Sequence, residues 1–250
     1  MHDRPVALVT GASQGIGLQI VKDLTAKGFT VLLGSRNFER GEAAAKEVGP
    51  DAVALQLDVT DLPSIAAAAA RIRTEFGRLD VLVQNAAIAT TSENVQSAQE
   101  FIAASRPSVV SLDEMRAVWN TNVFGVLAVY QAMVPILRST PNSRIVNVSS
   151  VSGSLTMASD PNSPVRPGFE VTYAASKTAL NALTVAMAIE LEADGIRVNA
   201  ITPGSTKTKM NPGGTDTVEE GAAEAVRLAT ITTEGTSGTF THATYGALPW

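Results

Sequence analysis

The sequence contains no cysteine and only two histidines, His2 and His242. Without cysteine the chain has no disulfide, no zinc–thiolate site and no thiol nucleophile. The histidines stand near opposite ends of the chain, so few side chains are present that could form a Ser-His-Asp triad or a histidine metal site. We therefore expect no metal. The lack of cysteine also agrees with a reducing compartment.

Charged side chains are also scarce, at 17% of the 250 residues, and the formal net charge is -5. No cluster of lysine and arginine forms a basic patch, so we expect neither nucleic acid nor an anionic membrane as a partner. The hydrophobic share of 45% is typical of a globular chain with a buried core.

No segment has the pattern of a leader or a membrane anchor. The apolar run at residues 6–9 is too short for the core of a signal peptide. The longest uncharged stretch, residues 117–137, has the length of a membrane span, but its polar residues and proline favour a buried helix. These interruptions are Asn120, Asn122, Gln131 and Pro135. We expect a soluble cytoplasmic protein.

Short apolar runs alternate with longer helical patterns along the chain. Buried strands are predicted at residues 6–9, 30–33, 53–57, 81–83, 145–148 and 198–201. Helices are predicted at residues 15–27, 38–48, 62–76, 112–138 and 172–193. This alternation predicts a single α/β domain over residues 1–250, with a Rossmann fold. Its doubly wound parallel sheet would have about seven strands, with helices on both faces.

Three segments interrupt or follow this alternation and are predicted to serve the substrate. Residues 90–110 are polar and loop-like, and residues 157–170 are rich in proline, so both are interpreted as insertions into one compact domain. Residues 205–220 are predicted to form a mobile substrate lid, with Gly213 and Gly214 as its flexible point.

A glycine-rich turn follows the first predicted strand and precedes the first predicted helix. Its spacing is G-x3-G-x-G, with glycines at 11, 15 and 17. Glycines allow a tight turn and a close approach of the backbone to a pyrophosphate, and the helix N-terminus offers free N–H groups. An ordinary glycine turn is the alternative. The predicted cofactor contacts here are Gly11, Ser13, Gln14, Gly15, Ile16 and Gly17.

The second predicted strand is followed by residues that favour NADP over NAD. Ser35 carries no charge to repel a 2′-phosphate, and Arg36 can pair with that phosphate, with Arg40 as a second candidate. The alternative for Arg36 is a solvated loop charge. Asp58 and Val59, after the third strand, are predicted to meet the adenine, although Asp58 is also a candidate helix N-cap.

Together these residues resemble the short-chain dehydrogenase/reductase family over essentially the whole chain, and in particular its NADPH-dependent, carbonyl reductase-like members. The resemblance rests on the order and spacing of several short motifs. They are Thr10-Gly11-x3-Gly15-x-Gly17, Asp58, Asn85-Ala86-Ala87, Asn122, Ser150, Tyr173-x3-Lys177 and Pro203-Gly204-x3-Thr208.

The resemblance implies that Tyr173 is a general acid that protonates a carbonyl oxygen while NADPH delivers hydride. A free tyrosine has a pKa of about 10, but a lysine at i+4 places its ammonium near the phenol and favours phenolate. Lys177 is also implied to bind the nicotinamide ribose. A pair of residues on a surface helix is the alternative for Tyr173 and Lys177.

The other implied catalytic residues are Ser150 and Asn122. Ser150 follows a predicted strand at the sheet edge where such folds bind ligands, and its hydroxyl can donate to a developing oxyanion. Ser149 is its rival. Asn122 matches the family asparagine that holds a water of the proton relay, and it is also compatible with a polar core residue that kinks a helix.

The remaining implied cofactor contacts surround the nicotinamide. They are Asn85, Ala86, Ala87, Tyr173, Lys177, Pro203, Gly204, Thr206 and Thr208. The chain departs from the family pattern at Thr206, where a valine is frequent. It also has Gln84-Asn85-Ala86-Ala87 in place of Asn-Asn-Ala-Gly.

The predicted function is therefore that of an NADPH-dependent ketoreductase acting on a small, apolar ketone or aldehyde. Met157, Phe169, Met210 and the segment Leu248-Pro249-Trp250 are predicted to line the pocket or to be ordinary core and edge packing. The alternatives are a 3-oxoacyl-carrier-protein reductase, a catalytically idle NADP-binding regulator and an NAD-dependent alcohol dehydrogenase. Because the separation of Ser150 and Tyr173 exceeds the usual family distance, the extra segment predicts a monomer or dimer rather than a tetramer.

Overall fold

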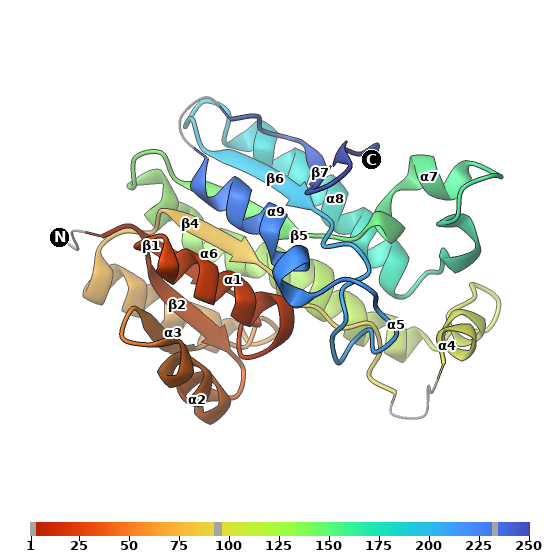
Figure 1. The fold of residues 1–250 in the computed structure, drawn as a ribbon, viewed down its shortest axis with the longest axis horizontal. Coiled ribbons are helices and arrows are strands. Elements are labelled where there is room, and N and C mark those ends of the chain that lie inside the picture. The colour runs from red at the N-terminus through yellow and green to blue at the C-terminus, as the bar shows by residue number, and fades with distance from the viewer. Residues whose placement is uncertain (1–3, 93–96, 232–234) are drawn as a thin grey trace.

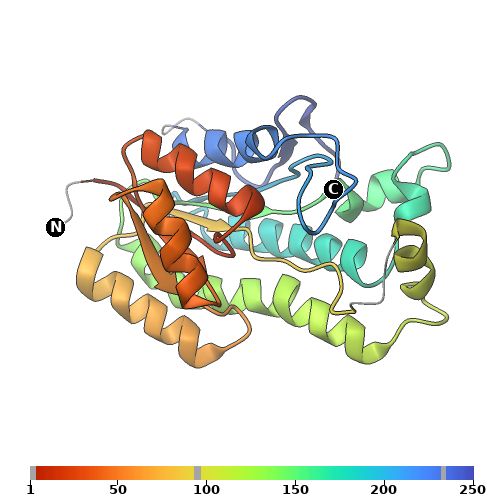
Figure 2. The ribbon, with the colours of Figure 1, turned by 60° about the horizontal axis from the view of Figure 1, so that its bottom comes forward.

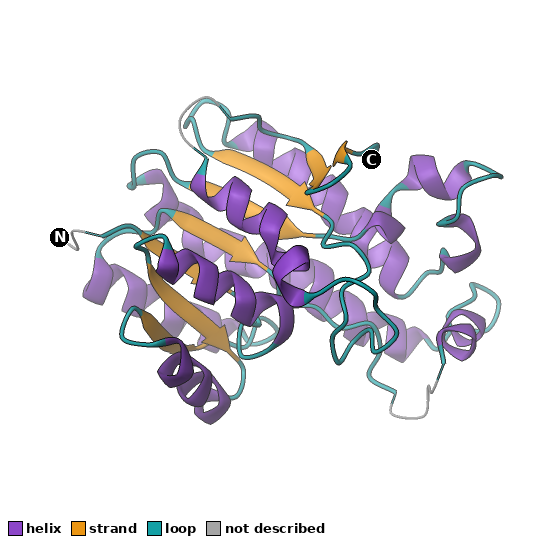
Figure 3. Ribbon diagram, viewed as in Figure 1, coloured by secondary structure: helices purple, strands orange, loops and turns teal. Residues whose placement is uncertain are grey.

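A computed structural model describes residues 4–92, 97–231 and 235–250. Its strands form one sheet in the order β3-β2-β1-β4-β5-β6-β7-β8, and every pairing is parallel except that of β7 with β8 (Figures 1 and 3). The strands are β1 Val6–Val9, β2 Thr30–Ser35, β3 Ala52–Gln56, β4 Val81–Gln84, β5 Arg144–Val148, β6 Arg197–Ile201, β7 Phe240–His242 and β8 Gly246–Ala247. Strand β1 is apolar throughout and β4 is apolar up to its last residue, Gln84, because both faces of the sheet are covered there.

Helices cover the two faces of the sheet in separate layers (Figure 2). One layer holds α1 (Gly15–Ala26), α2 (Phe38–Val48) and α9 (Val218–Thr230), and its apolar side chains form one core cluster with the sheet. The other holds α3 (Leu62–Arg71), α6 (Val126–Arg138) and α8 (Tyr173–Glu190), with a second cluster. The predicted Rossmann fold is confirmed.

The strand order reverses between β1 and β4, which lie side by side although the helices α1, α2 and α3 and the strands β2 and β3 separate them in sequence. Open α/β sheets bind ligands beyond the carboxyl ends of the strands at such a point. The glycine turn after β1 and the Asn85 segment after β4 therefore meet there, and the ends of β5 and β6 lie beside them.

All six predicted strands are present, with ends that differ by no more than two residues. The prediction missed β7, β8 and α9. The two strands are only a few residues long, and β7 depends on pairing with β6. Helix α9 carries a local signal that was overlooked, a capping box between Thr217 and Glu220, and it begins inside the predicted lid.

The long apolar helix predicted at residues 112–138 is built from α5 (Leu112–Trp119), a π-helical segment (Asn120–Gly125) and α6. At Gly125 a side chain would meet the Val59 carbonyl at 2.7 Å, so glycine permits this helix to pass close under the end of β3. By length and composition Leu112–Arg138 qualifies as a membrane span, but 56% of its most apolar window is buried inside the fold.

Both predicted insertions contain short helices, α4 (Ala98–Ala104) and α7 (Leu155–Ser159). Figures 1 and 2 place them at the end of the molecule toward which the parallel strands point. Part of the first insertion, residues 93–96, lies outside the described residues. The last residue of the chain reaches α7, because the Trp250 carbonyl accepts a hydrogen bond from the Thr156 N–H at 3.0 Å.

Candidate functional site

The glycine turn has the backbone shape that its sequence predicts. Gly11 and Gly15 have φ angles of 62° and 57°, in the left-handed region that favours glycine. A side chain on Gly17 would meet the Asn85 amide nitrogen at 2.5 Å. The Asn85 amide in turn donates to the carbonyls of Thr10 and Gly11, at 3.0 and 3.1 Å. Asn85 thus fixes the turn from the neighbouring strand.

The N-terminus of α1 is open for an anion. Its N-cap, Gln14, makes no side-chain hydrogen bond to the first turn, and no acidic residue occupies that turn. By contrast, Asn37, Asp61 and Ser111 cap the helices α2, α3 and α5. Free N–H groups and the positive end of the helix dipole suit a pyrophosphate, so these residues fit the phosphates of a dinucleotide cofactor.

Two predicted adenosine-side residues lie at the end of β2. Ser35 is buried, and its hydroxyl donates to the Asn37 carbonyl at 2.7 Å. Arg36 is exposed to solvent, while its own carbonyl accepts a hydrogen bond from Gln56 at 3.0 Å. The arginine side chain thus extends from an anchored backbone.

Asp58 is not the N-cap of the following helix, since that position belongs to Asp61, whose carboxylate accepts from the Ser64 N–H at 3.0 Å. The Asp58 carboxylate instead closes a local turn with the N–H and hydroxyl of Thr60, at 2.9 and 2.7 Å. Asp58 and Val59 follow β3 beside the end of β2, as the adenine prediction requires.

The predicted catalytic side chains come together from β5 and α8. Tyr173 is the first residue of α8, and its phenol is hydrogen-bonded to the Ser150 hydroxyl at the end of β5. Lys177 lies one turn later, with its amine 5.6 Å from the centre of the tyrosine ring and donating to the Val148 carbonyl at 2.8 Å. The geometry therefore matches the predicted grouping.

The two neighbouring serines face different ways. The Ser149 hydroxyl is buried and donates to the Asn181 amide oxygen at 2.6 Å, inside the packing between β5 and α8. The Ser150 hydroxyl accepts from the Ser152 N–H at 3.2 Å and reaches Tyr173. Only Ser150 is beside the phenol.

Asn122 is fully buried in the π-helical segment. Its amide group exchanges two hydrogen bonds with the backbone of Ile88, at 2.9 and 2.8 Å, and donates a third to the Ser176 hydroxyl at 3.0 Å. That hydroxyl donates to the Tyr173 carbonyl at 2.6 Å. Asn122 thus joins the loop after β4 to the first turn of α8, and its oxygen can accept one more donor.

Burial governs the titration of the tyrosine and lysine. Desolvation raises the pKa of Tyr173 to about 12, a change that the hydrogen bond with Ser150 opposes and the negative charge of Glu170 reinforces. Lys177 is only 2% exposed, and desolvation lowers its pKa to about 7. Before any ligand binds, the phenol is therefore protonated at neutral pH, whereas the amine is close to its midpoint.

Replacing Lys177 with methionine is expected to stabilise the fold near neutral pH. Between pH 7 and the usual lysine pKa of 10.5, the unfolded chain keeps a proton that the folded chain releases, so folding is opposed. Methionine removes this opposition. The free energy of unfolding should rise by roughly 2–4 kcal/mol at pH 7, after allowance for the lost bond to Val148.

The increase in the free energy of unfolding of Lys177→Met should stay constant below pH 7 and shrink as the pH rises toward 10.5. Denaturant unfolding at several pH values measures it, with the exposed Lys46→Met as the control. A Lys177→Met chain that is less stable at every pH would contradict the prediction.

The segment after β6 closes on itself. Ser205 and Asp216 pair through backbone and side chain, with an Asp216 carboxylate oxygen 2.8 Å from the Ser205 N–H. A side chain on Gly214 would meet the backbone of Thr206 and Lys207 at 2.5 Å. Gly214 is therefore packed in the neck of this loop, whereas a side chain on Gly213 would meet nothing within 4 Å. The flexible point of the lid stays a prediction.

The predicted contacts in this segment differ in orientation. Gly204 has a φ of 74° and lies against Asp216 and His242. The buried Thr206 hydroxyl donates to the Pro203 carbonyl at 2.8 Å and packs against Gly221 of α9. Its side chain is thus committed to the fold. Thr208 instead lies against the glycine turn, with its methyl carbon 3.6 Å from where a side chain on Gly15 would begin.

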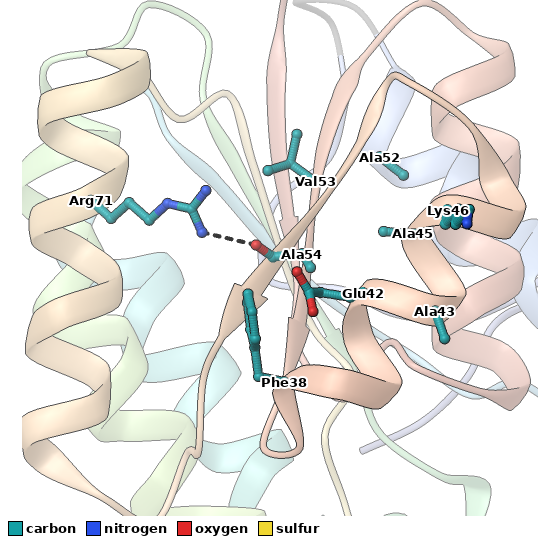
Figure 4. Close-up of a pocket in the computed structure, with 9 residues that line it drawn as sticks. All are labelled: Phe38, Glu42, Ala43, Ala45, Lys46, Ala52, Val53, Ala54 and Arg71. Carbon is teal, nitrogen blue, oxygen red and sulfur yellow. Dashed lines mark hydrogen bonds between the residues drawn. The ribbon is translucent and has the colours of Figure 1, made fainter.

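Among the apolar residues predicted to line the substrate pocket, some pack against the core and others are exposed to solvent. Trp250 stacks on Phe240 with ring centres 5.6 Å apart, which is edge packing, whereas Met210 is largely exposed. Figure 4 shows a separate open hollow between α2, β3 and α3, with Phe38 and Arg71 on its walls. None of the predicted site residues lines it.

Sequence reasoning missed Glu170 and Trp119, which hold the segment before Tyr173. The carboxylate of Glu170 binds the first N–H groups of α8. The Trp119 indole donates to the Val171 carbonyl at 3.2 Å. An acidic residue just before a predicted helix start was a usable signal for Glu170, whereas nothing local marks Trp119.

Known proteins share this fold and sequence pattern. The sequence profile of the short chain dehydrogenases matches residues 5–219. Salutaridine reductase of Papaver somniferum is 31% identical, with 95% of this chain and 94% of that one aligned. Its solved structure has a TM-score of 0.80 at 30% identity and covers 96% of this chain and 100% of that chain.

A second solved structure is that of a 3-ketoacyl-(acyl-carrier-protein) reductase from Brucella melitensis complexed with NADH. It has a TM-score of 0.78 at 25% identity, and the match covers 96% of each chain. Short-chain dehydrogenase anuI of Penicillium roqueforti is 33% identical over 91% of this chain and 89% of that one. The chain therefore belongs to the short-chain dehydrogenase/reductase family, whose oxidoreductases bind a nicotinamide cofactor.

Proposed function

We propose that this protein is an NADPH-dependent carbonyl reductase that reduces a ketone or aldehyde to an alcohol. The observation that carries the proposal is the grouping of Ser150, Tyr173 and Lys177. A serine hydroxyl from one element is hydrogen-bonded to a phenol from another, with a buried amine beside the ring. A chance pair on a helix surface does not bury its lysine or meet a third proton donor.

In this proposal Tyr173 is the general acid. The substrate's carbonyl oxygen accepts hydrogen bonds from the Tyr173 phenol and the Ser150 hydroxyl, and the phenol gives up its proton as negative charge develops on that oxygen. The nicotinamide cofactor supplies the hydride when bound. The ammonium of Lys177 stabilises the phenolate that remains, and the free acceptor on Asn122 holds the relay water that the family resemblance implies.

The preference for NADPH rests on Ser35 and Arg36. The exposed guanidinium of Arg36 can make paired, charge-assisted hydrogen bonds to a 2′-phosphate, and the uncharged Ser35 does not repel it. The remaining proposed contacts are Gly11, Ser13, Gln14, Gly15, Ile16 and Gly17 for the pyrophosphate, Asp58 and Val59 for the adenine, and Asn85, Ala86, Ala87, Pro203, Gly204, Thr206 and Thr208 for the nicotinamide half.

A 3-oxoacyl-carrier-protein reductase is the second candidate. Such an enzyme needs basic residues near its site to meet an acidic carrier, and Lys207 and Lys209 are exposed beside Thr208. The net charge of -5 and the proline-rich insertion favour a small ketone or aldehyde instead. An idle NADP-binding regulator is disfavoured because Tyr173 and Lys177 are both retained, and Ser35-Arg36 disfavours an NAD-dependent alcohol dehydrogenase.

One assay separates these functions. Cofactor absorbance is followed with a panel of apolar ketones, aldehydes and a 3-oxoacyl thioester, using NADPH and NADH in parallel. Turnover of simple carbonyls with NADPH is the expected result. Turnover of the thioester alone would favour the second candidate, and no turnover with any carbonyl would favour the regulator.

We also propose that the enzyme is cytoplasmic and assembles as a monomer or a dimer. The support is the insertion before Tyr173, in which α7 and its flanking turns project from the strand ends beside α8 (Figure 1). In the family resemblance, an insertion at this place obstructs the tetramer contact. Light scattering should give the mass of one or two chains, and a mass of four chains would refute the proposal.

A further inference from the structure

Glu170, the last residue of the proline-rich insertion, accepts hydrogen bonds from all four of the N–H groups that the start of α8 leaves without a helical partner. Its carboxylate accepts from Thr172 at 2.6 Å, from Tyr173 at 3.0 Å and from Ala174 at 2.5 Å. Its main-chain carbonyl accepts from Ala175 at 3.0 Å. The first four N–H groups of a helix have no partner within the helix, so one residue completes this terminus.

The cap is buried, and both its side-chain and its main-chain acceptors belong to Glu170. Thr172 stands at the N-cap position, yet its hydroxyl makes no capping hydrogen bond. Glu170 is only 3% exposed, and within the described part of the chain no basic side chain forms an ion pair with it. Its negative charge is compensated by backbone N–H groups and the positive end of the helix dipole.

The residue between the cap and the phenol is also fixed on both sides. The Val171 N–H donates to the Ser105 carbonyl at 3.3 Å, and its carbonyl accepts from the Trp119 indole at 3.2 Å. The first insertion and α5 therefore hold the backbone of this short segment, so the main chain that carries Glu170 cannot shift away from the start of α8 without breaking these contacts.

From this geometry we infer that Glu170 is a positioning residue for Tyr173. Its carboxylate fixes the helix turn that presents the phenol to Ser150 and places a negative charge close enough to act on the phenol. The inference rests on the proposed role of Tyr173 as the acid. A negative charge there keeps the proton on the phenol, which suits a group that must donate it during reduction.

The phenol faces few other charges. Lys177 is the titratable neighbour on α8, with its amine 5.6 Å from the centre of the ring. Ser150, after β5, is neutral, and so is Asn122 of the π-helical segment, which reaches the first turn of α8 through Ser176. Other charged groups on neighbouring elements are engaged elsewhere or lie at the far end of the sheet. These are Asp113 with Arg116, Glu114 with Thr90 and Thr91, Arg166 with the carbonyls of Ala158 and Ser159, and Arg197 at the start of β6.

Glu170→Gln tests the charge separately from the shape. Reduction should slow at high pH as the phenol loses its proton, and in this variant that decline should begin about one pH unit lower. kcat should also fall several-fold, with little change in the KM for NADPH. A purely structural cap would lower the melting temperature and kcat without moving the decline.

Asp61→Asn is the matched control, because it neutralises a capping carboxylate on α3, which follows β3, four strands away from β5 in the sheet. It should lower the melting temperature and leave the pH profile unchanged. If Glu170→Gln does not fold, Glu170→Asp carries the test. It keeps the charge but shortens the reach, so kcat should fall several-fold while the decline stays in place, and an unchanged kcat would overturn the inference.

A substrate-free measurement separates this inference from the proposed function. The tyrosinate absorbance of the protein minus that of its Tyr173→Phe variant reports the ionisation of Tyr173 alone. Over the pH range in which circular dichroism shows a folded chain, ionisation should begin at lower pH in Glu170→Gln. An unchanged onset overturns the inference even if the enzyme reduces ketones, and a shifted onset supports it even if none is reduced.

Discussion

Tyr173→Phe should lower kcat/KM for carbonyl reduction by about 10²–10⁴-fold, the range typical of a lost general acid. The change removes one hydroxyl, which is desolvated and hydrogen-bonded to Ser150 at the start of α8. The ring that packs near Lys177 remains. Because the lost contact acts on the oxygen that becomes negative, kcat should fall together with kcat/KM, while the affinity for NADPH stays close to that of the unchanged protein.

Steady-state kinetics and a separate cofactor titration by fluorescence check both parts of this prediction. Tyr130→Phe is the control, since Tyr130 is buried in the core on α6 and belongs to the packing rather than to the site. Loss of the Tyr130 hydroxyl should change the free energy of unfolding more than it changes kcat. A Tyr173→Phe enzyme that retains full activity would remove the proposed mechanism altogether.

Arg36→Ala should lower kcat/KM with NADPH by about 10–100-fold and leave the value with NADH almost unchanged. A charge-assisted hydrogen bond contributes about 1.5–3 kcal/mol, and only NADPH has the 2′-phosphate that Arg36 would bind. The backbone of Arg36 is held by Gln56, so the truncation should not disturb the turn between β2 and α2. The loss should appear mainly in KM.

The control here is Arg73→Ala, which removes an exposed arginine from the π-helical turn that follows α3. Arg36→Lys adds a graded case, because lysine keeps the charge but not the planar pair of donors, and its loss should be intermediate. Equal losses with NADPH and NADH would show that Arg36 does not meet the 2′-phosphate. A native preference for NADH would overturn the assignment of the cofactor.

The sequence alone determined which segments form the central strands of the sheet and where the glycine turn lies. Parallel strands buried on both faces need near-continuous apolar runs, such as Val6–Val9, and this requirement is local. The glycine spacing before α1 is equally local, because it reflects φ angles that glycine adopts without strain. Tyr173 and Lys177 at i and i+4 had to share one helix face.

The tertiary structure decided everything that depends on where a side chain points or on contacts distant in sequence. It separated Ser150 from Ser149, because adjacent residues at a strand end face opposite sides of the chain. It gave the α3 cap to Asp61, and it paired the short β7 with β6. It also brought Ser105 and Trp119 into contact with the backbone of Val171. No local pattern encodes these contacts, since each partner is fixed by the packing of other elements.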